Sequence, residues 1–463
     1  MRDLLKKVVD NALKFGAEFC DVRVVMRTAT QMRIENGIAK ELLAPQDFGA
    51  CIRVLLNGSW GVVSINSTAK DELFKALEEA ISSSKAKKGQ EKSRVAEIKA
   101  CETIVKSKFK IDPESVGLEE KMDKLLELEK AAREYDKKVK STSLVYQDEN
   151  INEVVCNSFN TFIDQTLTRV LARISVTAKE GTNRQSAHKV VGKLAGFEVI
   201  NDIEPEEFGV VAAERAVNLL KAKRAPSGKF VVVMDPEITG LFAHEAVGHN
   251  AEGDLVAFHE SLFDGMQNQK IASNKVTMID DATIEGAYGS YYFDSEGTPA
   301  SRRIIIERGV LKGFMHGLES AAILNEKPNG SCRAYLHQNV PIVRMSNTFF
   351  APGDYTLEEL IEDVKLGIFV RGARGGYVFV ERGQFTCNVE EAQMIRNGEL
   401  AEPLSNVSIG GLTLEILKNV EACSKDFELV DPGFCGKNGQ RMWVDDGGPY
   451  IRVKDIVVGG YKE

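Results

Sequence analysis

The sequence has no Cys-x-x-Cys pair, and its eight cysteines stand singly along 463 residues. This spacing excludes a small disulfide-stapled scaffold and is typical of a protein from a reducing compartment. No apolar run approaches the roughly 18 residues that cross a bilayer. The N-terminal segment, MRDLLKKVVDNALKFG, carries acids and bases among its apolar positions and so differs from a signal peptide. We therefore expect a soluble, cytoplasmic protein.

The sequence also lacks an excess of basic residues. Lysine and arginine total 59 against 68 aspartates and glutamates, which gives a formal net charge of −9. An extended basic face for DNA or RNA is therefore not supported. A phosphate-binding loop of the form GxxxxGK[ST] is missing as well, because Lys437 in the segment CGKNG lacks the required spacing. Composition argues against nucleic-acid partners and gives nucleotide binding little weight.

Apolar residues, in contrast, are plentiful at 43% of the chain. A chain of 463 residues is too long for one hydrophobic core, so we expect two domains. The segment KRAPSG at 223–228 has the polar, proline- and glycine-containing composition of a linker. We therefore place an N-terminal domain at 1–225 and a C-terminal domain at 226–463.

The first half mixes helices and strands without strict β-α-β alternation. Asn36-Gly37 and Asn57-Gly58 are the two best hairpin signals in the chain. Residues 138–180 alternate in three runs, which predicts a meander, and the polar run 82–94 predicts an exposed connection. Apolar periodicity predicts four helices, of which the first covers 2–16 and the last runs from Pro205 to Leu220. The second begins after a cap at Ser67 or Thr68 and buries Leu73, Leu77 and Ile81. The third begins at Pro113 and buries Leu118, Met122, Leu125 and Ala132.

The second half is richer in strands and glycines. Residues 304–314 and 394–403 both show a strand, a glycine turn and a second strand, and residues 355–367 are typical of a helix. The predicted fold class is therefore α+β in two domains. The N-terminal mixed domain has helices packed on an antiparallel sheet, and the C-terminal domain is strand-rich and carries a helix with an HExxxH motif.

That helix lies in the stretch KFVVVMDPEITGLFAHEAVGHNAEGD at 229–254. Phe230 to Val233 is a β-branched apolar run, which predicts a short buried strand. Asp235 can cap the helix that follows, and Pro236 suits its first position. His244 is then expected about two turns into the helix.

The helix carries His244, Glu245 and His249. Two imidazoles and a carboxylate are the usual parts of a zinc-hydrolase site. The histidines are five residues apart, which on a regular α-helix turns them about 140° away from each other. A local π-turn would take up the extra residue and return both rings to one side, and Gly248 can accept such a distortion. We therefore predict a π-turn at this motif.

Two histidines leave a zinc ion in need of a third protein ligand. Cys435 lies in PGFCGKNGQ between two glycines, in a bend that can present a thiolate. A lone loop cysteine is, however, more often an ordinary small apolar residue. On the residues alone the candidates are therefore Glu252, Asp254, His259, His316, His337 and the late cysteines.

Several blocks of the second half resemble one known family, the TldD/PmbA proteins, and within it the TldD-type subunit that keeps an HExxxH motif. These blocks cover most of the second domain in order, so the resemblance is specific, and the helix-first N-terminal half also fits. The blocks are AHEAVGHNAEGD at 243–254, DSEGTPASRR at 294–303, RMSNTFFAPGD at 344–354, GGYVFVERGQFTCNVEEAQMIRNGEL at 375–400 and GFCGKNGQ near the end.

The resemblance implies a zinc-dependent peptidase with the metal held by His244, His249 and Cys435 and with Glu245 as the catalytic acid/base. It also implies cleavage of unfolded or extended peptides. The expected assembly is a dimer, either of this chain alone or with a PmbA/TldE-type subunit of the same fold that lacks the motif. Family members also carry a label as modulators of DNA gyrase, but no residue here supports a direct role of that kind.

Hydrolysis also needs a hydrogen-bond donor to the oxygen of the scissile carbonyl. The candidates are backbone amides of the glycine-rich segments, His316 and His337.

The main alternative function is a non-catalytic partner or chaperone-like module in which zinc is structural or absent. A structural zinc site is closed by four protein ligands, whereas three ligands and an adjacent glutamate leave an open position. A zinc deaminase requires H-x-E and P-C-x-x-C, and the sequence contains neither.

Overall fold

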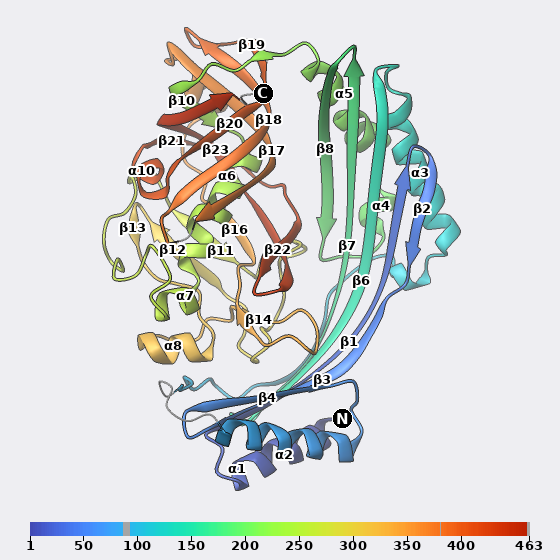
Figure 1. Ribbon diagram of the computed structural model, residues 1–463, viewed down its shortest axis with the longest axis vertical. Helices are drawn as coiled ribbons and strands as arrows, with labels where there is room; N and C mark the ends of the chain where they lie inside the picture. The colour runs from blue at the N-terminus through green and yellow to red at the C-terminus, as the bar shows by residue number, and fades with distance from the viewer. Residues whose placement is uncertain (87–92, 380, 461–463) are drawn as a thin grey trace.

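The computed structural model describes residues 1–86, 93–379 and 381–460, and two large sheets dominate it (Figure 1). The α+β class predicted from the sequence is confirmed. In the described ranges the first sheet has eight strands in the order β4-β3-β1-β6-β7-β5, with β2 beside β1 and β8 beside β7. These strands are β1 (Phe19–Glu35), β2 (Ile38–Leu43), β3 (Gln46–Leu56), β4 (Ser59–Ile65), β5 (Glu102–Lys106), β6 (Val139–Asn157), β7 (Thr161–Glu180) and β8 (Asn183–Lys193).

The predicted meander is present, but its strands are longer than the sequence suggested. The first two runs of residues 138–180 form the single strand β6, which pairs antiparallel with β1 and β7. The polar residues in the middle of β6 are buried in ion pairs. Asp148 lies 2.6 Å from Lys121, and Glu149 lies 2.9 Å from Arg27. Because these charged side chains are paired, they can be buried inside one continuous strand, although the sequence pattern suggests an interruption there.

Both predicted Asn-Gly hairpins are confirmed. Asn36 and Gly37 have φ values of 52° and 76°, and Asn57 and Gly58 have φ values of 54° and 73°. Two successive residues with positive φ are what a type I′ turn requires, and asparagine and glycine adopt this conformation at low cost.

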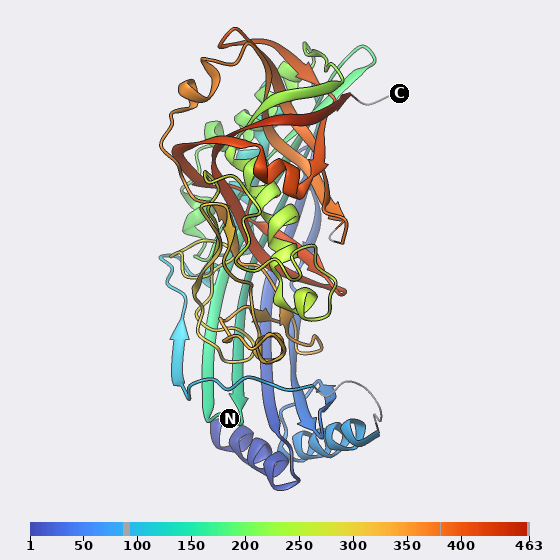
Figure 2. The ribbon, with the colours of Figure 1, turned by 90° about the vertical axis from the view of Figure 1, so that its left-hand side faces the viewer.

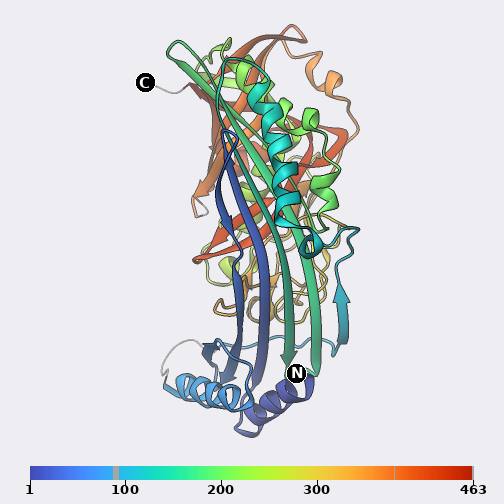
Figure 3. The same cartoon turned by 90° about the vertical axis from the view of Figure 1, so that its right-hand side faces the viewer.

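Helices cover the first sheet in two places. α1 and α2 lie at one end of the long axis, where Leu5 and Leu73 join a core with the strands (Figure 2). α3 and α5 lie on the face turned away from the second half, with Leu125 and Ala212 buried (Figure 3). The helices are α1 (Arg2–Lys14), α2 (Lys70–Ala86), η1 (Pro113–Ser115), α3 (Leu118–Glu134), α4 (Glu198–Asn201), η2 (Glu206–Val210) and α5 (Val211–Leu219).

Two connections predicted from polar sequence contain regular structure. α2 continues to Ala86, so the start of the run 82–94 is helical, and residues 87–92 lie outside the described residues. In the predicted linker 223–228, the first two residues form β9 (Lys223–Arg224) and pair parallel with β19 (Glu399–Ser405). Backbone pairing uses main-chain groups and therefore does not require apolar side chains.

Two predicted helices begin or end elsewhere. Pro113 opens only the short 3-10 turn η1, and α3 begins at Leu118, which is exposed rather than buried. The helix expected at 355–367 is reduced to α9 (Leu357–Ile361). Leu366 already belongs to β17, because the segment after it pairs with β10 in the sheet and this pairing prevails over local helical preference.

The second sheet mixes parallel and antiparallel pairs around β10. β10 is parallel to β17 and antiparallel to β23. The strand predicted at Phe230 to Val233 is present, with Val232 and Val233 fully buried and the two residues before them partly buried. In the described ranges thirteen strands form this sheet. They are β9 (Lys223–Arg224), β10 (Gly228–Met234), β11 (Met278–Asp281), β12 (Arg302–Glu307), β13 (Val310–Leu311), β16 (Asn347–Phe350), β17 (Leu366–Phe379), β18 (Gln384–Arg396), β19 (Glu399–Ser405), β20 (Val407–Leu412), β21 (Val420–Leu429), β22 (Gly433–Lys437) and β23 (Gln440–Gly460).

The remaining elements of the second half lie around this sheet (Figure 1). A separate short ladder joins two strands of two residues each, and several short helices connect the strands. Only the helix that follows β10 carries the HExxxH motif. The elements are β14 (Cys332–Arg333), β15 (Ile342–Val343), α6 (Pro236–Phe242), η3 (Ala243–Gly248), η4 (His249–Ala251), α7 (Gly253–Ala257), α8 (Leu318–Leu324), α9 (Leu357–Ile361) and α10 (Thr413–Lys418).

Buried arginines of the first sheet bind backbone carbonyls of the second half. Arg169 donates to the carbonyls of Tyr288 at 2.8 Å and Ser290 at 2.6 Å. Arg23 donates to the carbonyl of Leu336 at 2.6 Å. Hydrogen bonds from a buried charged donor are stronger than neutral ones, so these contacts hold the two halves together.

The first sheet lies within residues 19–193 and the second within 223–460. We propose to keep the division into domains 1–225 and 226–463, although β9 at the end of the first already pairs with the second sheet. Among the helices of the described ranges, none combines the length and the apolar character needed to cross a membrane.

Candidate metal centre

The helix with the HExxxH motif begins where the sequence predicted. Asp235 accepts a hydrogen bond from the amide of Ile238 at 2.9 Å, and Pro236 is the first helical residue. The second carboxylate oxygen of Asp235 accepts from the amide of Gly372 on β17 at 3.1 Å. One side chain therefore caps the helix and fixes its start to the sheet.

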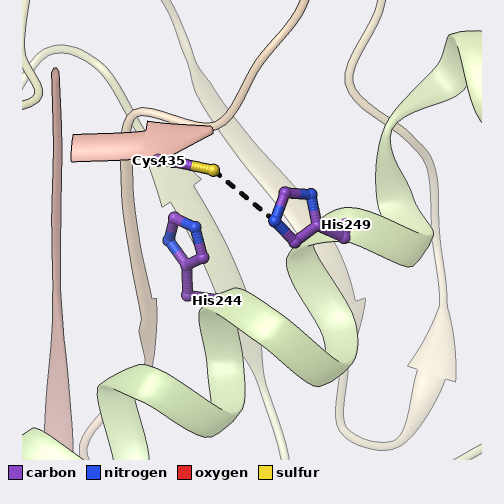
Figure 4. A group of neighbouring side chains, drawn as sticks. All are labelled: His244, His249 and Cys435. Atoms are coloured by element: carbon purple, nitrogen blue, oxygen red, sulfur yellow. Dashed lines mark hydrogen bonds between the residues drawn. The ribbon is translucent and has the colours of Figure 1, made fainter. Parts of the chain in front are cut away.

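The predicted π-turn is confirmed. Residues Ala243–Gly248 form a π-helix between α6 and the 3-10 turn η4. The imidazoles of His244 and His249 consequently lie on the same side, with ring centroids 5.3 Å apart and planes at 86° (Figure 4). The extra residue of the motif is thus absorbed by the backbone, as one π-turn allows.

Gly248 leaves space for a neighbouring side chain, a role that the sequence did not reveal. Its φ of −58° is ordinary right-handed helix, so the position needs no special backbone freedom. A Cβ atom there would lie 2.1 Å from Sδ of Met345. Met345 is fully buried, so the helix can approach it this closely only because residue 248 has no side chain.

Cys435 approaches the two histidines from β22 (Figure 4). One donor atom from each of His244, His249 and Cys435 can be chosen so that all three lie within 4.8 Å of one another. Sγ of Cys435 is 3.5 Å from Nε2 of His249, although the two residues are 186 positions apart. The carbonyl of Cys435 accepts from the buried Arg344 at 2.6 Å, which fixes its backbone.

The three side chains change one another's protonation. Burial alone would raise the pKa of the Cys435 thiol, but the charge of His244 and hydrogen bonds to both imidazoles lower it to about 4. Burial also disfavours charged imidazoles, yet Cys435 raises the pKa of His244, and Glu252 together with Cys435 raises the pKa of His249. The sulfur is therefore a thiolate at neutral pH, which is the form that binds a metal.

The donor set fits a zinc ion. Thiolate and imidazole are the two ligand types that structural and catalytic zinc sites use most, and soft thiolate disfavours magnesium or calcium. The three residues are buried or nearly so, with side-chain exposures of 4% and 14% for His244 and His249. A metal held here would be largely shielded from bulk water.

Glu245 lies at the open side of this group. Its Oε2 is 4.0 Å from Nε2 of His249, and 22% of its side chain is exposed. The carboxylate is thus both next to the donor atoms and accessible to solvent. A group in this position can exchange protons with a water molecule or a substrate beside the metal.

Glu252, an early candidate for the third ligand, lies on the far side of His249. Its Oε2 is 3.1 Å from Nδ1 of His249, the nitrogen that does not face Cys435. Burial would raise the pKa of Glu252, but Lys437 and His249 lower it to about 2, so it is a carboxylate ion. Asp254, another candidate, is 2.8 Å from Lys437.

The three remaining histidine candidates make other contacts. His259 is exposed and lies 2.7 Å from Asp264. Ring nitrogens of the other two contact neighbouring polar side chains. His316 lies 3.3 Å from Ser320, and His337 lies 2.7 Å from Asn66.

Sequence reasoning missed three polar residues that contact the segments or side chains of the site. Arg344 and Lys437 support β22, and Oδ2 of Asp446 lies 3.8 Å from Nδ1 of His244. None of them belongs to a local motif with the histidines. Lys437 could have been noticed, because it stands two residues after a candidate cysteine, but the sequence gives no indication of which acids it meets.

Family models of the PmbA/TldA metallopeptidases match nearly the whole chain. The model of domain 1 matches residues 20–84, the central-domain model matches 111–220, and the C-terminal-domain model matches 227–460.

Individual proteins agree with this match. A protein named metalloprotease from Methanothermobacter thermautotrophicus is 38% identical over 96% of each chain. A protein named zinc metalloprotease TldD homolog from Saccharolobus solfataricus is 30% identical over 98% of this chain and 99% of that one. The crystal structure of TldE from Thermococcus kodakarensis superposes with a TM-score of 0.79 at 18% identity, covering 99% of this chain and 100% of that one.

Proposed function

This chain belongs to the PmbA/TldD metallopeptidase family, and on that premise we propose that it is a zinc-dependent peptidase of unfolded or extended peptides. In this proposal His244, His249 and Cys435 hold the metal, and Glu245 is the catalytic acid/base. The name of the Saccharolobus solfataricus relative, which includes zinc, supports the choice of metal.

The observation that carries the proposal is the convergence of the three donors. One helix and one strand, 186 residues apart in sequence, bring a thiolate and two imidazoles within 4.8 Å. Thiolate and imidazole are the donor types that zinc sites in proteins use, so this combination supports a zinc site. A carboxylate with partial solvent access, Glu245, stands beside them.

The chemistry follows from these residues. Zinc, when bound, supplies a Lewis acid and lowers the pKa of water at its open position toward about 7. Glu245 accepts a proton from the attacking water through its carboxylate and returns it to the amine that leaves. The negative charge of Cys435 offsets part of the charge of the metal, so we expect a modest hydrolase.

The burial of the donors favours extended substrates. His244 is 3% exposed and Cys435 is 7% exposed, so a peptide bond must enter the protein surface to reach them. A folded protein holds its peptide bonds too rigidly for this, whereas an unfolded chain can insert one strand. This argument supports peptides and unfolded proteins as the substrate class.

A dimer is the proposed assembly, either of two copies or with a TldE-type subunit. The fold shared with TldE of Thermococcus kodakarensis supports a partner of the same architecture.

We also propose a cytoplasmic location, because all eight cysteines fall within the described ranges and are free.

The direct test is metal analysis of protein purified without chelator, together with an assay on an unstructured peptide. The assay is run both with and without a TldE-type partner. We expect one zinc per chain and cleavage of the peptide. The alternative, a non-catalytic module, predicts either no zinc or zinc without cleavage under any of these conditions. A closed structural site would also need a fourth protein ligand.

A further inference from the structure

Lys437 uses its ammonium group to join two segments that carry the proposed ligands. Nζ lies 2.8 Å from both carboxylate oxygens of Asp254, 3.1 Å from Oε2 of Glu252 and 3.2 Å from the carbonyl of Val343. An ammonium has three donors, and these partners use them all. The side chain is only 9% exposed, so the contacts are not ordinary surface ion pairs.

The position of Lys437 gives these contacts a specific consequence. It is the last residue of β22, two residues after Cys435, and in the described part of the chain β22 forms its ladder with β23 alone. Side chains also tie β22 to other segments, among them Arg344, which donates to the carbonyl of Cys435. Lys437 ties the strand to Glu252 and Asp254, which lie three and five residues after His249 in the sequence.

Glu252 is shared between Lys437 and His249. Its Oε2 is 3.1 Å from Nζ of the lysine and 3.1 Å from Nδ1 of the imidazole. Its Oε1, in contrast, has no hydrogen-bond partner within the described residues, and the residue is fully buried. Lys437 and His249 both contact Oε2 of Glu252, so the lysine helps to hold this oxygen away from the donor atoms.

We propose that Lys437 is a positioning residue of the metal centre. Its side chain fixes β22 against residues 252–254. In this role it sets the distance from Cys435 to His249 and keeps Glu252 on the Nδ1 side of the ring. Cys435 rather than Glu252 then completes the donor set. The proposal rests on the proposed function in one respect, namely that a metal binds to His244, His249 and Cys435.

The surroundings of Lys437 allow its replacement. The side chain borders a cavity of about 240 Å³, with Asn438, Trp60 and Phe258 also in its lining. A methionine can therefore take its place without overpacking. Lys121 offers a matched control, because it is 2% exposed and pairs with Asp148 at 2.6 Å on the first sheet.

The test is cobalt and zinc titration of metal-free Lys437→Met, Lys437→Arg and Lys121→Met in the full chain. Cobalt reports thiolate ligation through the sulfur-to-metal charge-transfer band, which does not depend on peptidase activity. We expect Lys437→Met to bind metal roughly 10- to 100-fold more weakly, as for other residues that orient ligands, and to show a weaker thiolate band. Lys437→Arg should recover most of both, and Lys121→Met should match the wild type.

An unchanged affinity and band in Lys437→Met would overturn the proposal, and so would an equal loss in Lys121→Met. If circular dichroism shows that Lys437→Met does not fold, Lys437→Gln is judged by the same two readouts. A wild-type protein without any thiolate band would instead overturn the metal set of the proposed function, a result distinct from an unchanged variant.

Discussion

Oε2 of Glu252 lies 3.1 Å from Nδ1 of His249, on the side of the ring turned away from Cys435. His244 has a different environment. Oδ2 of Asp446 is 3.8 Å from its Nδ1, beyond hydrogen-bond distance, and this nitrogen has no hydrogen-bond partner within the described ranges. The two imidazoles of the motif are therefore held in unequal ways.

The protonation of the two acids increases this difference. Lys437 and His249 overcome the effect of burial and lower the pKa of Glu252 to about 2. Burial and the charge of Asp431 raise the pKa of Asp446 well above its ordinary value. His249 thus faces a carboxylate ion, which orients the ring and strengthens it as a ligand, whereas burial favours the uncharged form of the acid beside His244.

Glu252→Gln should therefore weaken zinc binding by roughly 10- to 100-fold. The thiolate band of the cobalt form should persist, because the glutamine leaves Cys435 in place. Asp446→Asn is the matched control, and it should change the affinity far less, since Asp446 makes no hydrogen bond to His244. Competition with a chromogenic chelator at neutral pH measures both constants. Equal losses in the two variants would contradict this account.

Glu245→Ala should abolish most peptide hydrolysis while zinc content stays at the wild-type level. Loss of a general acid/base typically lowers the rate by roughly 10²- to 10⁴-fold. The assay follows kcat/KM on an unstructured fluorogenic peptide, with the partner subunit present if the wild type needs it. Glu260→Gln, on the exposed segment that follows α7, serves as the control and should keep full activity. Cleavage that survives in Glu245→Ala would show that the assigned base is wrong.

Cys435→Ser should lose most of its zinc. The substitution exchanges a thiolate, whose pKa is about 4 in this environment, for a hydroxyl that does not ionise near neutral pH. Cys423→Ser is a suitable control, because Cys423 is also free and buried, and burial raises its pKa to about 12. Metal analysis should give full occupancy in the control only. Full zinc in Cys435→Ser would move the third ligand elsewhere, with Glu252 as the first alternative.

The features that the sequence predicted well are those with a local cause. The Asn-Gly turns need two adjacent residues that tolerate positive φ, and Asp235 with Pro236 forms a complete helix start within two positions. The π-turn follows from a five-residue spacing between His244 and His249 once both are assumed to bind one ion. Each of these signals lies within a few residues of the structure that it specifies.

The features that could not be predicted depend on contacts between distant segments. β6 continues through Asp148 and Glu149 because Lys121 and Arg27 pair with them, and no local pattern reports those partners. In the same way, the residues alone left several candidates beside Cys435 for the third ligand, and only the resemblance to a family singled it out. Tertiary packing brings it to the histidines, and a single sequence carries no record of that approach.

Gly248→Ala should destabilise the protein and disturb the π-turn. The new Cβ would lie 2.1 Å from Sδ of the buried Met345, so either the helix or the methionine must move. Overpacking of this kind costs about 1–3 kcal/mol. The double variant Gly248→Ala with Met345→Ala should show less than the sum of the two single losses in urea unfolding, because the second change removes the clash. Strict additivity would mean that the methionine is not the obstacle.

Asp445 is a buried carboxyl group whose titration should lower the stability of the protein as pH rises. Burial is the main cause that raises its pKa to about 7, compared with about 4 for an unfolded aspartate. A group whose pKa is higher in the folded state contributes stability that is complete below about pH 4 and is lost as pH rises through about 7. At about 1.4 kcal/mol for each pKa unit, the loss is on the order of a few kcal/mol.

Asp445→Asn should remove this component, because the amide does not titrate. We expect the free energy of unfolding of the variant, relative to the wild type, to rise between about pH 4 and about pH 7. Urea unfolding of metal-free protein measures this, so that protons released by metal binding do not contribute. Asp123→Asn, at an exposed position of α3, should leave the profile of the wild type unchanged. Parallel pH profiles of the free energy of unfolding for the wild type and Asp445→Asn would contradict this account. They would mean that Asp445 is already ionised at acidic pH and that another group compensates its charge in the folded protein.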